Sequence, residues 1–205
     1  MEFPPNEQEF LLKVACATIR RRLEGASAPP MVTPISSNVI CPAGCFVSLH
    51  SKHTHTLRGC VGRIDSSGPL LMVLGNVAWQ VIGDPRFVER PVSLAELPSV
   101  TVELSVLDIL IPAANPLDFD PPNDGIYLIA GGRTGVFLPQ VARETGWSRE
   151  QLLDRLCQEK IGIPATAWRA PGARLLKFKS ITIGPADFSF EDPPMPAPNA
   201  LARPV

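Results

Sequence analysis

The chain of 205 residues lacks several features that mark whole classes of protein. It has no apolar run of the roughly 18 residues that a membrane-spanning helix needs. Residues 1–10 are polar and acidic, unlike the basic and then apolar start of a secretion signal. With 19 basic and 20 acidic side chains, the net charge is only −1. We therefore expect a cytoplasmic protein with no membrane partner, and nucleic acid is not indicated as a partner.

Two further absences argue against a nucleotide cofactor and against a disulfide framework. No Walker-type or dinucleotide-type glycine loop follows a predicted strand, so no cofactor is expected. No CxxC pair occurs, and five widely spaced cysteines fit a reducing compartment better than a disulfide framework. Cys16 and Cys157 fall in apolar helical patterns and are expected to be buried. Among the thiols, we expect only that of Cys60 to be accessible.

Hydrophobic periodicity predicts helices and strands that alternate without a regular βαβ rhythm. Residues 10–23 and 70–81 carry apolar side chains at three- and four-residue spacing, which indicates amphipathic helices. Ser148 and Gln151 have capping-box spacing and predict the start of another helix. Strands are expected at 45–49, 57–64, 100–107, 126–130 and 174–183, the last being one strand or a pair. Several of them show the one-sided alternation of an antiparallel sheet, which favours the α+β class.

One hexapeptide in the predicted hairpin stands out, Leu57-Arg58-Gly59-Cys60-Val61-Gly62. Because glycine has no side chain, Gly59 and Gly62 leave the backbone around Cys60 open to close approach by a ligand or partner. Period-two counting places Arg58 and Cys60 on the same strand face, and a nearby guanidinium favours a thiolate. Cys60 is therefore a candidate nucleophile or thiol carrier, with Arg58 beside it.

A structural interpretation of the hexapeptide stays open. In that interpretation Gly59 and Gly62 permit close packing of a neighbouring helix, Cys60 fills a small apolar space, and Arg58 is structural.

Two other charged residues are candidates for the same site. Glu103 lies in the middle of a predicted strand and could act as a general base if its face met Cys60, although strands often bear an exposed glutamate. Arg86 could present an anion-binding guanidinium beside the hexapeptide, although Asp84-Pro85 is also an ordinary turn after a helix.

The three histidines, His50, His53 and His55, all lie within ten residues before Cys60. Histidine and cysteine are zinc ligands, so a metal site is conceivable. The spacing matches no established zinc signature, and a hairpin loop is an equally natural place for exposed histidines. We therefore predict no metal.

Five ordered segments resemble one protein family, the AMMECR-type domain, whose prokaryotic members are called AmmeMemoRadiSam system protein A. The segments are residues 44–49, 57–62, 84–87, 103–107 and 137–141. Leu-Arg-Gly-Cys with a following glycine is the signature of that family. One helix end departs from the family pattern, because residues 157–162 read Cys-Gln-Glu-Lys-Ile-Gly where the family has Cys-x-Lys-Ala-Gly-Leu.

The resemblance implies an architecture and a type of function. The expected fold is α+β, with an antiparallel sheet flanked by helices in a larger lobe that holds both termini, and a smaller lobe. We expect this domain over 1–188 and a mobile proline-rich tail over 189–205. The implied partners are Memo-like and radical-SAM proteins.

Two hypotheses of function follow. In the first, the protein is an accessory component of such a system and binds a partner or small substrate at the Leu57–Gly62 face, with Gly59, Gly62 and Arg86 contributing to binding. In the second, it is a stand-alone enzyme that uses Cys60, with Arg58 and Glu103 assisting. The sequence decides neither whether the protein is an enzyme nor its oligomeric state.

Overall fold

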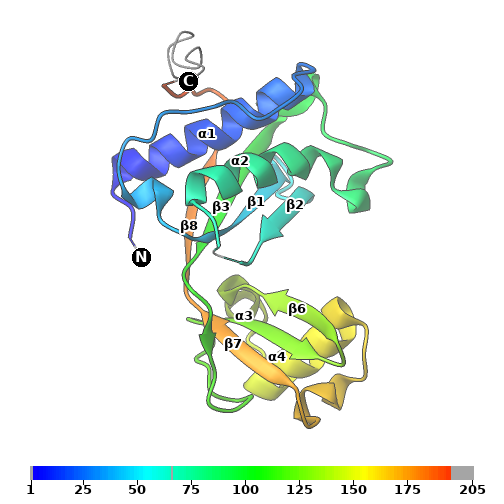
Figure 1. Ribbon diagram of the computed structural model, residues 1–205. Coiled ribbons are helices and arrows are strands. Elements are labelled where there is room, and N and C mark those ends of the chain that lie inside the picture. The colour runs from blue at the N-terminus through cyan, green and yellow to red at the C-terminus, as the bar shows by residue number, and fades with distance from the viewer. Residues whose placement is uncertain (1, 66, 195–205) are drawn as a thin grey trace. The chain divides into compact units, whose positions relative to one another are not determined.

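The structure is a computed structural model that describes residues 2–65 and 67–194, and it contains two four-stranded antiparallel sheets with helices (Figure 1). The chain divides into two compact units. The larger unit contains the described residues up to Val106 and those from Ile181 onward, and the smaller unit is Leu107–Ser180. The predicted α+β class is confirmed.

The larger unit consists of one sheet, two long helices and several short helices. Its long helices and strands are α1 (Pro5–Leu23), β1 (Gly44–Ser51), β2 (Leu57–Arg63), α2 (Leu70–Gln80), β3 (Val100–Leu107) and β8 (Ser180–Ala186). Its 3₁₀ helices are η1 (Asn38–Ile40), η2 (Val81–Gly83), η3 (Pro85–Phe87) and η4 (Leu94–Ser99). The strand order is β2-β1-β3-β8. The predicted helix at 10–23 begins earlier than expected, because Pro5 is suited to the first helical turn.

The helices α1 and α2 pack against each other and cover one face of this sheet (Figure 1). Strand β1 turns Cys45, Val47 and Leu49 into the resulting core, and all three are fully buried. Strand β3 contributes Val102, Leu104 and Val106, as its alternation predicts. The opposite face of the sheet therefore carries the alternate residues of each strand.

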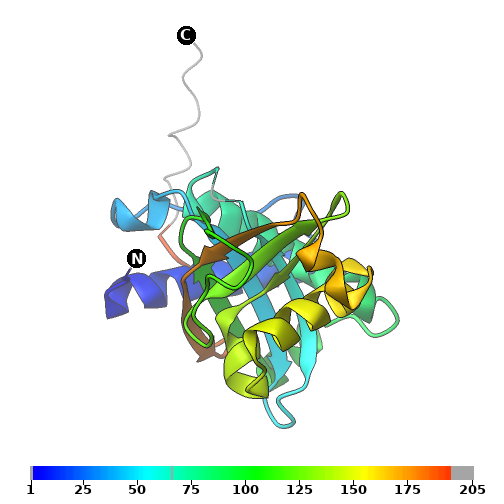
Figure 2. The same ribbon diagram turned by 90° about the horizontal axis from the view of Figure 1, so that it is seen from below.

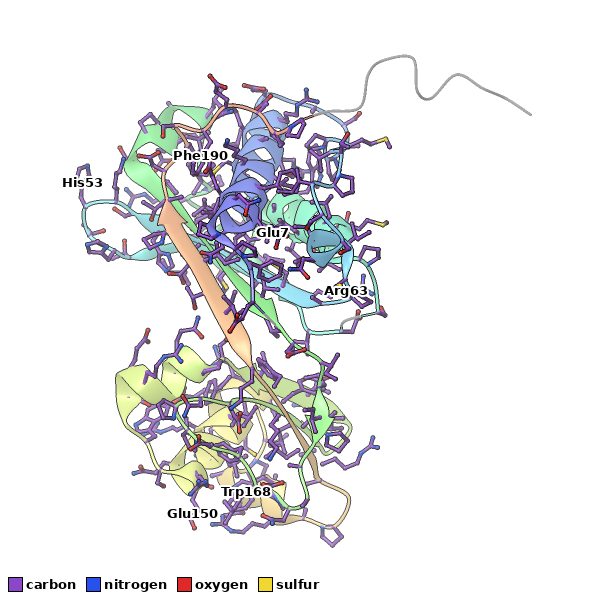
Figure 3. The ribbon with its side chains drawn as sticks, turned by 90° about the vertical axis from the view of Figure 1, so that its left-hand side faces the viewer. Glu7, His53, Arg63, Glu150, Trp168 and Phe190 are labelled. Carbon is purple, nitrogen blue, oxygen red and sulfur yellow. The ribbon has the colours of Figure 1, made fainter. Side chains whose placement is uncertain are left out.

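The hairpin β1–β2 has an antiparallel register in which Ser48 lies opposite Cys60 and Phe46 lies opposite Gly62. The register shifts between Leu49 and His50, before the connecting loop. Figure 3 shows His53 at the outer tip of that loop. The hairpin agrees with the sequence prediction. The period-two count that places Arg58 on the face of Cys60 does not hold, because the register passes from the pair Leu49–Gly59 to the pair His50–Leu57 and skips Arg58.

The smaller unit packs its helices against one face of the second sheet (Figure 2). Its elements are β4 (Ile111–Pro112), β5 (Gly125–Ala130), β6 (Arg133–Phe137), α3 (Pro139–Thr145), α4 (Arg149–Arg155), a π-helix η5 (Leu156–Ile161), a 3₁₀ helix η6 (Ala165–Arg169) and β7 (Arg174–Phe178). The strand order is β4-β7-β5-β6. Gly131 and Gly132 form the two-residue turn between β5 and β6, and both have the positive φ that a type I′ hairpin needs.

The last predicted strand region, 174–183, proves to be a pair of strands that belong to different sheets. Strand β7 lies in the smaller sheet and β8 in the larger one. The capping box of Ser148 and Gln151 is confirmed at the start of α4. The helix that it begins turns into the π-helix at Leu156 and ends at Gly162, whose φ is 71°.

The tail expected from residue 189 lies outside the described residues from 195 onward. Its described part belongs to the larger unit and binds α1 and the loop after it. The Arg20 Nη2 atom donates a hydrogen bond to the carbonyl of Phe190 at 3.4 Å, and it also donates to the carbonyl of Phe188, just before this segment, at 2.7 Å. The backbone N–H of Thr33 donates to the carbonyl of Pro194 at 3.0 Å. Within the described ranges, no helix has the length and apolar character to cross a bilayer.

Candidate functional site

The thiol of Cys60 lies in the middle of β2, on the sheet face that α1 and α2 leave uncovered. It is half-buried. The hydroxyl of Ser48 donates a hydrogen bond to it, with 3.3 Å between Oγ and Sγ. The two side chains can approach this closely because Ser48 and Cys60 face each other across the hairpin.

The backbone of Cys60 is held from the open edge of β2 by two side chains of the next segment. Its N–H donates to Asp84 Oδ2 at 2.8 Å, and its carbonyl accepts from Arg86 Nη2 at 2.8 Å. Strand β2 is the outermost strand of its sheet, so these side chains satisfy backbone groups that a further strand would otherwise bind. Because the N–H and the carbonyl of Cys60 both point away from β1, Cys60 and Ser48 form a non-hydrogen-bonded pair of the antiparallel ladder. Side chains of such a pair lie closer together than those of a hydrogen-bonded pair.

Asp84 and Arg86 are themselves joined by a two-pronged ion pair. Arg86 Nε donates to Asp84 Oδ1 at 3.0 Å, and Nη2 donates to Oδ2 at 2.7 Å. The Asp84 side chain is 3% exposed. Hydrogen bonds from the Arg86 side chain, and then from the backbone N–H groups of Cys60 and Arg86, lower the pKa of Asp84 to about 2. The pKa of Arg86 is raised, chiefly by its hydrogen bond to Asp84.

Arg58 is directed to partners other than the thiol. Its Nη1 atom donates to Glu96 Oε1 at 2.8 Å, and its Nη2 atom donates to the carbonyl of Arg90 at 3.2 Å. Glu96 also accepts from Ser93 in the capping box of η4. The hydrogen bond from Arg58, followed by that from the Ser93 backbone, lowers the pKa of Glu96 to about 2. Arg58 therefore ties β2 to the segment before β3.

Both glycines of the hexapeptide allow close packing. A Cβ atom at Gly59 would lie 3.0 Å from the carbonyl oxygen of Val81 in η2. A Cβ atom at Gly62 would overlap the ring of Phe46, its partner across the hairpin. The structural interpretation therefore holds for Gly59, which packs against the 3₁₀ helix η2, and is corrected at Gly62, whose close neighbour is a ring of β1 rather than a helix. It does not extend to Cys60, which lies outside the buried core.

Glu103 lies on the same uncovered sheet face as Cys60, because its neighbours Val102 and Leu104 point into the core. Strand β1 separates the two residues. Among the residues that the structure describes, no hydrogen bond joins Glu103 to Cys60. The arrangement brings Cys60 and Glu103 to one face without joining them by a hydrogen bond, and it directs Arg58 to Glu96 and the Arg90 carbonyl instead.

His53 and His55 are exposed in the loop between β1 and β2, and His50 is half-buried in β1. Within residues 2–65 and 67–194, no group of three or more His, Cys, Asp or Glu side chains is placed to hold a metal ion.

The remaining thiols correct one expectation. Cys41 is exposed, so Cys60 is not the only accessible thiol. Cys41 follows the last residue of η1, and its thiol donates a hydrogen bond to the carbonyl of Ser37 at 3.4 Å. Cys16 and Cys157 are buried as predicted, and Cys45 is buried as well. Burial raises the pKa of Cys16 and Cys45 to about 12 and raises that of Cys157.

Sequence reasoning missed Asp84 and Ser48 as parts of this site. Asp84 was interpreted as a turn residue, which it also is, since it caps η3 by accepting the backbone N–H of Arg86. Its hydrogen bond to Cys60 spans 24 residues, and no local pattern indicates such a bond. Ser48 could have been found by counting pairs back from the hairpin loop, but the irregularity at Leu49 and His50 prevents a reliable count.

The fold and the site define a two-unit α+β protein in which an ion pair fixes the backbone of a half-buried cysteine on an edge strand. The model of the AMMECR1 family matches residues 12–183. The chain belongs to the AMMECR1 family, as its resemblance to the AMMECR-type domain predicts.

Relatives and a solved structure are similar over most of the chain. Protein MJ0810 of Methanocaldococcus jannaschii is 34% identical over 182 residues, which cover 85% of this chain and 88% of the relative. Protein PH0010 of Pyrococcus horikoshii is 33% identical over 181 residues, covering 83% and 85%. The crystal structure of PH0010, described as an uncharacterized protein, matches with a TM-score of 0.81 and 27% identity over 89% of this chain and 93% of that one.

Proposed function

We propose that this protein is an AmmeMemoRadiSam system protein A, an accessory component that works with Memo-like and radical-SAM proteins. Its Leu57–Gly62 face binds a partner or a small substrate of that system. Membership in the AMMECR1 family supports the system. The hydrogen bonds that Asp84 and Arg86 make with the Cys60 backbone support the location of the binding face.

The single observation that carries the proposal is that the residues around Cys60 are already bound to other parts of the fold. Arg58, Gly59 and Gly62 each have a structural partner, and two side chains hold the Cys60 backbone. The thiol of Cys60 and the hydroxyl of Ser48 lie beside each other on the uncovered sheet face, which also carries Glu103. A binding group that is fixed before its ligand arrives loses less conformational entropy on binding.

The proposal is tested with purified Memo-like and radical-SAM proteins from the same organism. We expect at least one of them to bind the full chain in isothermal titration calorimetry, and Cys60→Ser together with Ser48→Ala to weaken that binding by about tenfold or more. The matched control is Cys41→Ser, which changes the other accessible thiol. Absence of binding by both proteins contradicts the system. Binding that the double variant leaves unchanged contradicts the location of the face.

A second candidate function, a stand-alone thiol enzyme, is favoured by the Ser48 Oγ to Cys60 Sγ contact of 3.3 Å and by Glu103 on the same sheet face. A catalytic thiol reacts faster than its exposure alone dictates. This function therefore requires iodoacetamide to modify Cys60 at pH 7 faster than the more exposed Cys41. A slower reaction at Cys60, mapped by peptide mass spectrometry, contradicts it.

The proposal places the protein in the cytoplasm. All five cysteines are unpaired, which suits a reducing compartment. Cell fractionation with antibody detection checks this location, and recovery of the protein outside the cytoplasmic fraction contradicts it.

A further inference from the structure

The smaller unit contains a polar cavity that belongs to no part of the site around Cys60. Its volume is about 520 Å³, and it lies along the outer side of α4 and the π-helix η5. Trp147, Gln151, Asp154, Arg155, Gln158 and Ala165 line it. A volume of this size lies within the range of small-molecule sites.

One wall of the cavity is a flat aromatic and cationic surface. Trp147 is half-buried between α3 and α4, and the Arg155 guanidinium carbon lies 5.4 Å from the centre of its ring. Arg155 is held by an ion pair with Glu159, one helical turn along, at 3.2 Å. The guanidinium lies over one face of the indole, and Trp147 also packs against the core of the smaller unit. A planar ligand can therefore stack on the guanidinium while it contacts the exposed part of the indole.

The other wall carries both hydrogen-bond donors and hydrogen-bond acceptors. The Gln151 Oε1 atom accepts the backbone N–H of Ser148, which leaves the amide donors of Gln151 directed away from the cap. Asp154 Oδ1 accepts the indole N–H of Trp168 at 2.7 Å, which fixes the carboxylate. Gln158 adds a second carboxamide, with donor and acceptor atoms.

The π-helix accounts for the position of Gln158. Leu156 and Ile161 are both buried and are five residues apart, which is the spacing of a π turn. This wider turn keeps the apolar side chains in the core while Gln158 stays exposed on the cavity side. Segments of π-helix often occur at functional sites.

We propose that this cavity binds a nucleobase, supplied as a free nucleoside or as an unpaired base of a single strand. The two charged side chains of the lining are both paired, Arg155 with Glu159 at 3.2 Å and Asp154 with Arg169 at 3.5 Å, so the cavity suits a neutral ligand rather than a phosphate or a carboxylate. A base provides a flat ring for Trp147 and an edge with donors and acceptors for Gln151, Asp154 and Gln158. Guanine fits best, because its edge carries N–H donors for a carboxylate beside a carbonyl acceptor for an amide.

Guanosine, adenosine and a five-nucleotide single-stranded RNA are titrated against the full chain, with tryptophan fluorescence and calorimetry as readouts. We expect saturable binding of guanosine that is at least about threefold tighter than that of adenosine. Trp147→Ala weakens binding by about tenfold or more, as stacking contributions predict. Gln158→Ala weakens it by about threefold, and because Gln158 is exposed this variant is expected to fold normally.

Two controls separate this site from other regions. Trp79→Phe changes a tryptophan of the larger unit that lies beneath Arg22, and Cys60→Ser changes the proposed binding face. Both are expected to leave guanosine affinity within about twofold. Tighter binding of the RNA than of guanosine identifies a single strand as the source of the base, and the reverse order identifies a free nucleoside. Absence of saturation, or binding that neither Trp147→Ala nor Gln158→Ala weakens, overturns the proposal.

Discussion

The carboxylate of Asp84 accepts the backbone N–H of Cys60, with 2.8 Å between Oδ2 and the nitrogen. This bond joins a short helix after α2 to the centre of an edge strand. Arg86 completes the connection through the Cys60 carbonyl. The position of the cysteine thus depends on a segment that is separate from the hairpin itself.

Asp84→Asn is expected to lower the free energy of unfolding at pH 7 by roughly 2 kcal/mol, since it removes the charge that binds Arg86 and Cys60. The pKa of Asp84 is lowered from 3.8 to about 2 in the folded protein. Its stabilisation is therefore complete above about pH 4 and is lost as the pH falls toward 2. Urea unfolding between pH 2 and pH 7 should show the two proteins converging in acid.

The control for this prediction is Glu89→Gln, which removes an exposed carboxylate from the same unit. We expect it to change the free energy of unfolding by less than about 0.5 kcal/mol at pH 7. A constant difference between Asp84→Asn and the original protein from pH 7 to pH 2 contradicts the role assigned to the ion pair.

Gly62→Ala is expected to lower the free energy of unfolding by about 1–3 kcal/mol, because the added methyl group overlaps the Phe46 ring. Phe46→Leu in the same chain should recover part of this loss, since the smaller side chain leaves the ring position. A double-mutant cycle by urea denaturation measures the coupling. Gly68→Ala is the control, because its methyl group meets only Val73 at 3.8 Å, an ordinary contact.

Thiol labelling of the folded protein should divide the five cysteines into three groups. Under the binding function, Cys41 reacts first because it is exposed, and half-buried Cys60 follows. Cys16, Cys45 and Cys157 stay unmodified until urea is added, because they are buried and their pKa values are raised. Mass spectrometry of N-ethylmaleimide-treated peptides at pH 8 gives the order. Early labelling of Cys45 would show that β1 does not face the core.

Arg58→Met tests whether this guanidinium serves the fold or the thiol. Because Arg58 binds Glu96 and the Arg90 carbonyl, we expect a lower melting temperature. The rate of Cys60 alkylation at pH 8 should stay within about twofold of the original rate. A stable variant whose Cys60 alkylation slows by about tenfold supports instead the assistance to the thiol that the enzyme hypothesis requires.

Local sequence patterns predicted much of this fold. The periodicity of residues 70–81, the capping box at Ser148 and the alternation in residues 100–107 each depend on contacts within one element. The division of residues 174–183 between two sheets could not be predicted, because the hydrophobic pattern of a strand does not indicate which sheet that strand joins.

The candidate site was predictable only in part. Period-two strand geometry places Cys60 on the face opposite Gly59 and Val61, but it does not predict the register irregularity at Arg58. The partners of these residues do not, because Glu96 is 38 positions from Arg58 and Asp84 is 24 positions from Cys60. The exposure of Cys41 was missed for a similar reason, since it depends on which segments cover a loop.

Strand β8 completes the larger sheet beside β3, yet it follows the whole smaller unit in the sequence. During translation, the ribosome therefore releases this strand only after residues 107–180 have been synthesised. A nascent chain that stops short of residue 180 presents β3 with one edge unpaired, and such an edge can recruit chaperones or aggregate. Because the smaller unit lies between β3 and β8 in the sequence, the larger sheet can be completed only after the smaller unit has been synthesised.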